Sequence, residues 1–121
     1  AWAADRARYI DPSAGLATRV RNLLFTKELW ILFLFRFGTW IYLEAPAFLR
    51  LPLKLVWMPI NDFVQTLLDT HIEATTRIGP GLFIGHTGGI WINPGSVVGA
   101  YCNVAQGVVV GAAGSARAPI I

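Results

Sequence analysis

A six-residue period runs through the second half of this 121-residue sequence and constrains its fold more than any other feature. Single aliphatic residues recur at this interval with one interruption: Ile72, Ile78, Ile84, Ile92, Val98, Val104 and Val110. Three hexads fit one turn of a three-sided coil, in which each hexad supplies a short parallel strand and an inward aliphatic side chain. A β-sandwich would instead show alternation with a period of two. We therefore predict a parallel β-helix over residues 71–121.

The interruption of this period contains the first candidate functional residue. The interval between Ile84 and Ile92 is eight residues, so two extra residues lie between them, and His86 is among these. His86 is also the only histidine in a stretch without any charged residue. Extra residues in a repeat coil usually map to one face, often the binding face. The sequence therefore indicates His86 as a functional residue.

Residues 1–70 contain residues that typically begin or end α-helices. Asp11 followed by Pro12 suits a helix start, and Thr26 can cap a helix from Lys27 to about Leu43. Asn61 can cap a last helix. Three prolines are expected to divide the chain between them into short pieces: Pro46, Pro52 and Pro59. We thus expect an α+β fold, with an N-terminal helical region over residues 1–70 followed by the coil.

The helix from Lys27 is apolar almost all round, with Arg36 near its middle. It is shorter than the about 20 apolar residues that span a bilayer. A buried helix is the first interpretation. Peripheral contact with a membrane surface, through Trp30, Trp40 and Tyr42, is the alternative.

Charge argues for an assembly rather than for a nucleic-acid partner. Only 14% of the residues are charged, the net charge is +3, and no long run of Lys or Arg occurs, so a nucleic-acid groove is excluded. No charged residue lies between Arg77 and Arg117. A stretch of this kind needs cover from further coils or other subunits. We expect a homo-oligomer, and a threefold one suits a three-sided coil.

The single cysteine, Cys102, excludes an intramolecular disulfide framework and a zinc site built from cysteines. It fits a reducing, cytoplasmic location. The sequence begins with Ala1 rather than Met and ends without a stop signal in the repeat region. We therefore expect a piece truncated at both ends, with more coils after residue 121.

The segment Ile84-Gly-His-Thr-Gly-Gly-Ile-Trp-Ile, within a repeat that runs from Ile78 to Gly111, resembles the serine acetyltransferase family of hexapeptide-repeat acyltransferases. The helical part is similar too, in Asp11-Pro12 and over residues 29–42. The resemblance implies a left-handed β-helix, trimers or pairs of trimers, and active sites between neighbouring prisms. It also implies transfer of an acetyl group from acetyl-CoA, as cosubstrate and without a metal, to the hydroxyl of serine in cysteine biosynthesis.

The same resemblance implies roles for individual residues. His86 would be the general base that takes a proton from the acceptor hydroxyl. Gly111, Ala112 and Ala113 match the segment that runs beside the pantetheine arm of acetyl-CoA. Arg117 matches a residue that binds the carboxylate of the amino acid, which a guanidinium can hold through two oxygens.

Two positions depart from the family pattern. His71 stands at the second catalytic position, where the family has an acid that orients the catalytic histidine. An imidazole cannot replace a carboxylate in stabilising an imidazolium, so either Asp69 or Glu73 compensates, or His86 works unassisted. Ala118 replaces a histidine that contacts serine. Acetylation of a sugar in capsule or exopolysaccharide synthesis therefore stays open.

Two further alternatives use the same fold. A non-catalytic scaffold would make His86 dispensable. The trimeric carbonic anhydrases of this fold hold zinc with three histidines, whereas this chain has only His71 and His86.

Overall fold

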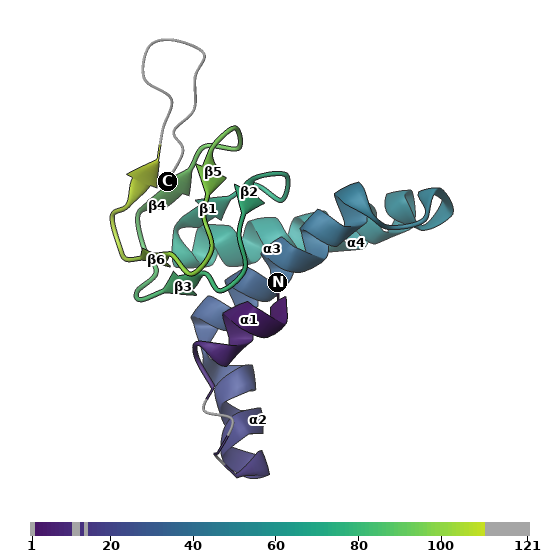
Figure 1. Cartoon of the computed structure of the whole chain (residues 1–121). Coiled ribbons are helices and arrows are strands. Elements are labelled where there is room, and N and C mark those ends of the chain that lie inside the picture. Colours follow the sequence, from purple (N-terminus) through teal and green to yellow (C-terminus); the bar gives the residue numbers. More distant parts are fainter. Residues whose placement is uncertain (1, 11–12, 14, 111–121) are drawn as a thin grey trace.

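The computed structural model describes residues 2–10, 13 and 15–110. Within them, four helices precede seven short strands (Figure 1). The helices are α1 (Trp2–Ala7), α2 (Leu16–Phe25), α3 (Lys27–Leu43) and α4 (Ala47–Leu68). The strands are β1 (Thr70–Ile72), β2 (Arg77–Ile78), β3 (Phe83–Ile84), β4 (Ile90–Ile92), β5 (Val97–Val98), β6 (Asn103–Val104) and β7 (Val109–Val110).

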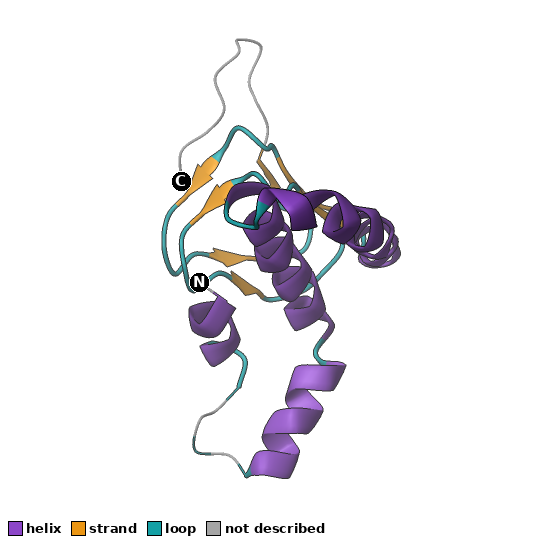
Figure 2. Cartoon of the chain, turned by 90° about the vertical axis from the view of Figure 1, so that its right-hand side faces the viewer, coloured by secondary structure: helices purple, strands orange, loops and turns teal. Residues whose placement is uncertain are grey.

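The strands form a three-sided coil. Strands β1, β2, β3 and β4 each pair in parallel with the third strand that follows, which gives the sheets β1-β4-β7, β2-β5 and β3-β6. The chain therefore visits three sheets in turn before it returns to the first. Figure 2 shows these short strands, joined by turns, wound beside the helices. The predicted helical region followed by parallel strands is confirmed.

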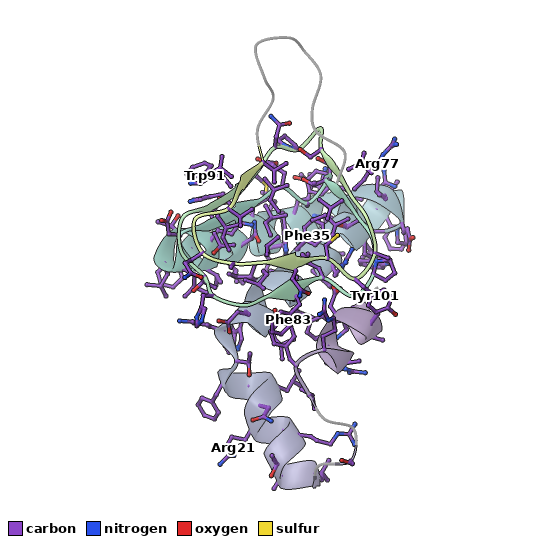
Figure 3. The ribbon with its side chains drawn as sticks, turned by 60° about the vertical axis from the view of Figure 1, so that its left-hand side comes forward. Arg21, Phe35, Arg77, Phe83, Trp91 and Tyr101 are labelled. Carbon is purple, nitrogen blue, oxygen red and sulfur yellow. The ribbon has the colours of Figure 1, made fainter. Side chains whose placement is uncertain are left out.

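The recurring aliphatic residues fill the inside of the coil. Six of the seven are buried, Val104 is half-buried, and Ile90 is buried with them. Each such side chain contributes about 1.5–3 kcal/mol on burial. The inner residues of α3, Ile31, Leu32 and Phe35, belong to the same buried cluster. Figure 3 looks into the coil with Phe35 at its centre, so α3 closes one end of the coil.

Arg36 explains how a charged residue fits within the apolar helix α3. Its Nε lies 2.6 Å from Oδ2 of Asp5, which is fully buried in α1. Its Nη1 and Nη2 donate to the carbonyl oxygens of Ile78 and Gly79, each at 2.8 Å. The guanidinium therefore joins α1 and α3 to the first turn of the coil. Within the described residues, no helix combines the length and hydropathy that crossing a membrane requires.

The expectation of short pieces around the prolines was wrong, because α4 runs through both Pro52 and Pro59. An interior proline removes a helix hydrogen bond. Both prolines lie on the exposed side of α4, where water can pair with the carbonyl groups left free. Packing offsets the rest of the cost: Trp57 is buried and its Nε1 donates to the carbonyl of Leu34 in α3 at 2.9 Å.

Two predicted helix caps also differ from the structure. Asn61 lies buried inside α4 rather than at the start of a helix. Thr26 does precede α3 as its N-cap residue, but its side chain makes no capping hydrogen bond. The predicted helix start at Asp11 and Pro12 lies outside the described residues.

Candidate active site

His86 lies on a loop that interrupts the coil between β3 and β4, and we call residues 85–89 the His86 loop. The strand pairing measures the interruption directly. Ile84 pairs with Val104 and Ile92 pairs with Val110. The interval from Ile84 to Ile92 is eight residues, whereas the paired interval in the next turn, from Val104 to Val110, is six. The two extra residues therefore lie in the His86 loop.

The imidazole of His86 is exposed. Among the described residues, no side chain or backbone group forms a hydrogen bond with its ring. Gly88 and Gly89 follow with φ of 116° and 64°, which non-glycine residues rarely adopt. The ring is therefore presented to solvent by a loop whose exit has an unusual backbone conformation.

Tyr9 holds the entry to the His86 loop. Its hydroxyl donates to the carbonyl of Ile84 at 2.9 Å and accepts from the N–H of the same residue at 2.5 Å. The ring stacks on Phe83, with centroids 4.7 Å apart. Burial raises the pKa of Tyr9 to about 12, partly opposed by its hydrogen bond with Ile84. The phenol is therefore a neutral anchor at physiological pH.

Two successive side chains, Asp69 at the end of α4 and Thr70 at the start of β1, hold the exit of the loop. Oδ2 of Asp69 accepts from the N–H of Gly89 at 3.0 Å, and Oγ1 of Thr70 accepts from the N–H of Gly88 at 3.4 Å. Gly88 also accepts a hydrogen bond from the N–H of Gly107 in the next turn of the coil at 2.9 Å. Both ends of the His86 loop are thus attached to other parts of the chain.

His71, the other residue assigned to catalysis, points outward from β1 between the buried Thr70 and Ile72. Its ring stacks on that of Trp91 at a centroid distance of 3.8 Å and an angle of 24°. Its Nε2 lies 3.2 Å from Oδ1 of Asp69. Within the described part of the chain, no ring contact or hydrogen bond joins His71 to His86. Asp69 links them indirectly, because it contacts both His71 and the His86 loop.

The remaining predicted site residues cannot be placed in this geometry. Gly111, Ala112, Ala113 and Arg117, like the substituted position Ala118, lie outside the described residues.

Two hollows formed by the described residues lie away from the His86 loop. One of about 590 Å³ is open to solvent between α1, α2, α3 and α4 and is almost wholly apolar, with Trp30, Phe33 and Trp57 in its wall. A smaller polar one of about 220 Å³ lies where α4 meets the first turn of the coil, beside Asn61 and Glu73. His86 lines neither of them. Among residues 2–10, 13 and 15–110, no group of three His, Cys, Asp or Glu side chains could hold a metal ion.

Tyr9 is the site residue that sequence reasoning missed. It lies 75 residues from Ile84 in the chain, and no local pattern marks a tyrosine that follows a short helix. The sequence does indicate Asp69 as one of two acids that could compensate for His71, because it lies two residues before it. Its contact with Gly89 could not be read from the sequence.

Comparison with known proteins gives consistent results. No family model matches the chain. A serine acetyltransferase of Synechococcus elongatus is 32% identical over 79 residues, which make up 65% of this chain and 30% of that protein. The chain thus spans about a third of this relative and less than half of the structures described next.

Solved structures match almost the whole described fold. Soybean serine acetyltransferase complexed with serine superimposes with a TM-score of 0.68 and 23% identity, over 99% of this chain and 48% of the soybean one. The serine acetyltransferase of Brucella abortus strain S19 gives a TM-score of 0.69 and 23% identity, over 98% of this chain and 47% of its own. At this identity the structures establish the fold.

Proposed function

We propose, from the premise that the chain belongs to the serine acetyltransferase family, that it is part of an acyl-CoA-dependent O-acetyltransferase with His86 as the general base. One observation carries the proposal. His86 is exposed on the two-residue insertion of the coil, and the loop that bears it is attached at both ends. A scaffold has no structural need for such a loop.

The proposed reaction is a direct acyl transfer. His86 takes the proton of the acceptor hydroxyl as the oxygen attacks the carbonyl carbon of the thioester. A tetrahedral oxyanion forms and is stabilised by hydrogen-bond donors. Its collapse breaks the C–S bond, the acetyl ester is released, and the thiolate of CoA takes the proton back from the imidazolium. An imidazole suits this exchange because it can accept and return a proton near neutral pH.

Serine is the acceptor that we propose. The soybean structure is a complex with serine, and a further serine acetyltransferase structure is a complex with cysteine. In this proposal, which for these residues rests on the family resemblance alone, Arg117 binds the carboxylate of the amino acid, and Gly111, Ala112 and Ala113 bind the pantetheine arm. A sugar acceptor in exopolysaccharide synthesis is the alternative, because Ala118 removes one contact with serine.

The family fold supports several finer proposals. The coil over residues 71–121 is left-handed, and it forms the second of two regions, after the helical region of residues 1–70. Copies assemble as a trimer or a pair of trimers, in the cytoplasm, with each active site completed by a neighbouring prism. The absence of charged residues between Arg77 and Arg117 supports an assembly, since that surface calls for cover.

Thiol release from acetyl-CoA by the full-length protein tests the function. Serine, hexoses and nucleotide sugars are compared as acceptors, and the measurement is repeated with His86→Ala. We expect activity with serine and a loss of kcat of about 10²–10⁴ in the variant, the usual contribution of a general base. Gln106→Ala is the matched control, because Gln106 is exposed at the equivalent corner of the next turn.

Each outcome selects one interpretation. Activity with sugars alone would move the acceptor to the exopolysaccharide class. Equal rates for His86→Ala and Gln106→Ala would remove His86 from catalysis and leave the scaffold interpretation.

A further inference from the structure

The attachment of the His86 loop at Asp69 goes beyond a single hydrogen bond. The carboxylate accepts from the N–H of Gly89 at 3.0 Å through Oδ2. The backbone carbonyl of Asp69 accepts from the N–H of Ile90 at 3.2 Å. One residue therefore holds two successive peptide groups, at the point where the His86 loop rejoins the coil.

The backbone of Asp69 has a left-handed conformation that serves this contact. Its φ is 49° and its ψ is 48°, and its N–H caps the end of α4 by bonding to the carbonyl groups of Gln65 and Thr66. Aspartate and asparagine adopt this conformation more readily than most residues, and glycine does so freely. The end of α4 and the end of the His86 loop are thus joined through one residue.

His71 holds the carboxylate of Asp69 in place. Its Nε2 lies 3.2 Å from Oδ1, so each oxygen of Asp69 has its own partner. Stacking on Trp91, which pairs with His71 in the register of β1 and β4, holds the imidazole. Glu73, the other acid near His71, is exposed and makes no side-chain hydrogen bond or ion pair with the described residues.

We infer that Asp69 is a positioning residue for His86: it fixes the His86 loop through Gly89, and the His71–Trp91 stack supports it. This inference rests on the proposed function, in which His86 is the base. It assigns to Asp69 a mechanical role through the backbone, in a chain that has His71 where the family has an orienting acid. A displacement of about 1 Å at a reacting group can cost about a hundredfold in rate, so an anchor of this kind has a measurable effect.

Three variants of the full-length protein test the inference. Asp69→Gly keeps the left-handed cap and removes the carboxylate. Asp69→Asn tolerates the same backbone conformation and keeps an oxygen that can accept from Gly89, but it has no charge. Glu73→Gln is the matched control, as it neutralises the neighbouring acid. For each we measure kcat and KM for acetyl transfer and the thermal unfolding temperature.

We expect Asp69→Gly to lower kcat by about 10- to 100-fold and to change KM for acetyl-CoA by less than about twofold, because the loop and not the cosubstrate is displaced. Asp69→Asn should recover most of kcat, and Glu73→Gln should behave as the unchanged protein. An unchanged kcat in Asp69→Gly overturns the inference. Equal losses in Asp69→Gly and Asp69→Asn also overturn it, since the charge rather than the anchor would then matter.

Hydrogen–deuterium exchange separates this inference from the proposed function. The peptide that covers residues 85–90 should exchange faster in Asp69→Gly than in Asp69→Asn, whether or not the protein is active. Faster exchange without any thiol release from the unchanged protein would retain the anchor and reject the acetyltransferase. Unchanged exchange would reject the anchor, whatever the activity.

Discussion

The helices and the coil solve the burial of apolar side chains in different ways. In the coil, one inward residue per hexad fills the interior, and among its residues up to Val110 only three large apolar ones are exposed: Trp91, Tyr101 and Val109. In the helices, eighteen large apolar residues are exposed, spread over α2, α3 and α4. Helix α2 has no buried residue at all, and Figure 1 shows α2 and α4 extending away from the coil. The repeats of the coil therefore bury most of their large apolar side chains. The helices leave an apolar surface of the kind that marks an interaction site.

The two regions are joined by polar side chains that are buried or half-buried. Asp5 accepts from Arg36 and also from the backbone N–H groups of Gly81 and Leu82, at 2.9 and 2.8 Å. Tyr9 likewise forms hydrogen bonds with the backbone of the coil, at Ile84 in β3. The helical region thus contacts the backbone of the coil from Ile78 to Ile84, the residue before the His86 loop.

Removal of Arg36 should have the largest effect on this junction. Arg36→Ala leaves the carboxylate of Asp5 buried without its cation and leaves the carbonyl groups of Ile78 and Gly79 without their donor. Breaking a buried ion pair in this way costs about 3–5 kcal/mol. Urea unfolding of the variant measures this cost. A loss below 1 kcal/mol would show that Arg36 contributes little to the coupling of helices and coil.

A pair of equal truncations tests the contrast in burial. Ile90→Ala removes a fully buried side chain of the coil and should cost about 2–5 kcal/mol. Leu55→Ala acts on an exposed residue of α4 and should cost about 0.5 kcal/mol or less. Both are measured by urea unfolding at a concentration where light scattering shows a monomer. The measurement is then repeated at a concentration where copies associate. If Leu55→Ala costs as much stability as Ile90→Ala only at this higher concentration, neighbouring copies cover α4.

The pH dependence of stability should show a smaller effect, through Tyr9. Its pKa is about 12 in the folded chain and 10.0 when unperturbed, mainly because of burial. The folded state therefore keeps the phenol proton at a pH where the unfolded state loses it. Stability from this group is complete below pH 10 and is lost as the pH rises from 10 to about 12. After allowance for solvent screening, the loss is about 1–2 kcal/mol.

Tyr9→Phe is the control for that measurement. It should lose about 1 kcal/mol at pH 7, where the hydrogen bonds to Ile84 are missing, and it should lack the extra decline above pH 10. Parallel curves for the two proteins between pH 9 and 11 would contradict the assignment to Tyr9.

The coil was predictable because its information is local and repeated. An aliphatic residue every six positions specifies a strand, a corner and a core residue together, and each turn confirms the register of the one before. The same regularity made the insertion at His86 visible. The helical region lacked such redundancy: Pro52 and Pro59 favoured short pieces, yet α4 is continuous because Trp57 and its neighbours pack on α3 and the coil.

The sequence by itself thus determined the period of the coil, the place of its interruption and the histidine found there. Only the tertiary structure decided what holds that histidine in place. Tyr9 meets Ile84 across 75 residues, Asp5 meets Arg36 across 31, and Asp69 meets Gly89 across 20. Such pairs leave no periodic trace, because a hydrogen bond depends on where two groups lie in space. Chain topology, which only the folded molecule displays, brings them together.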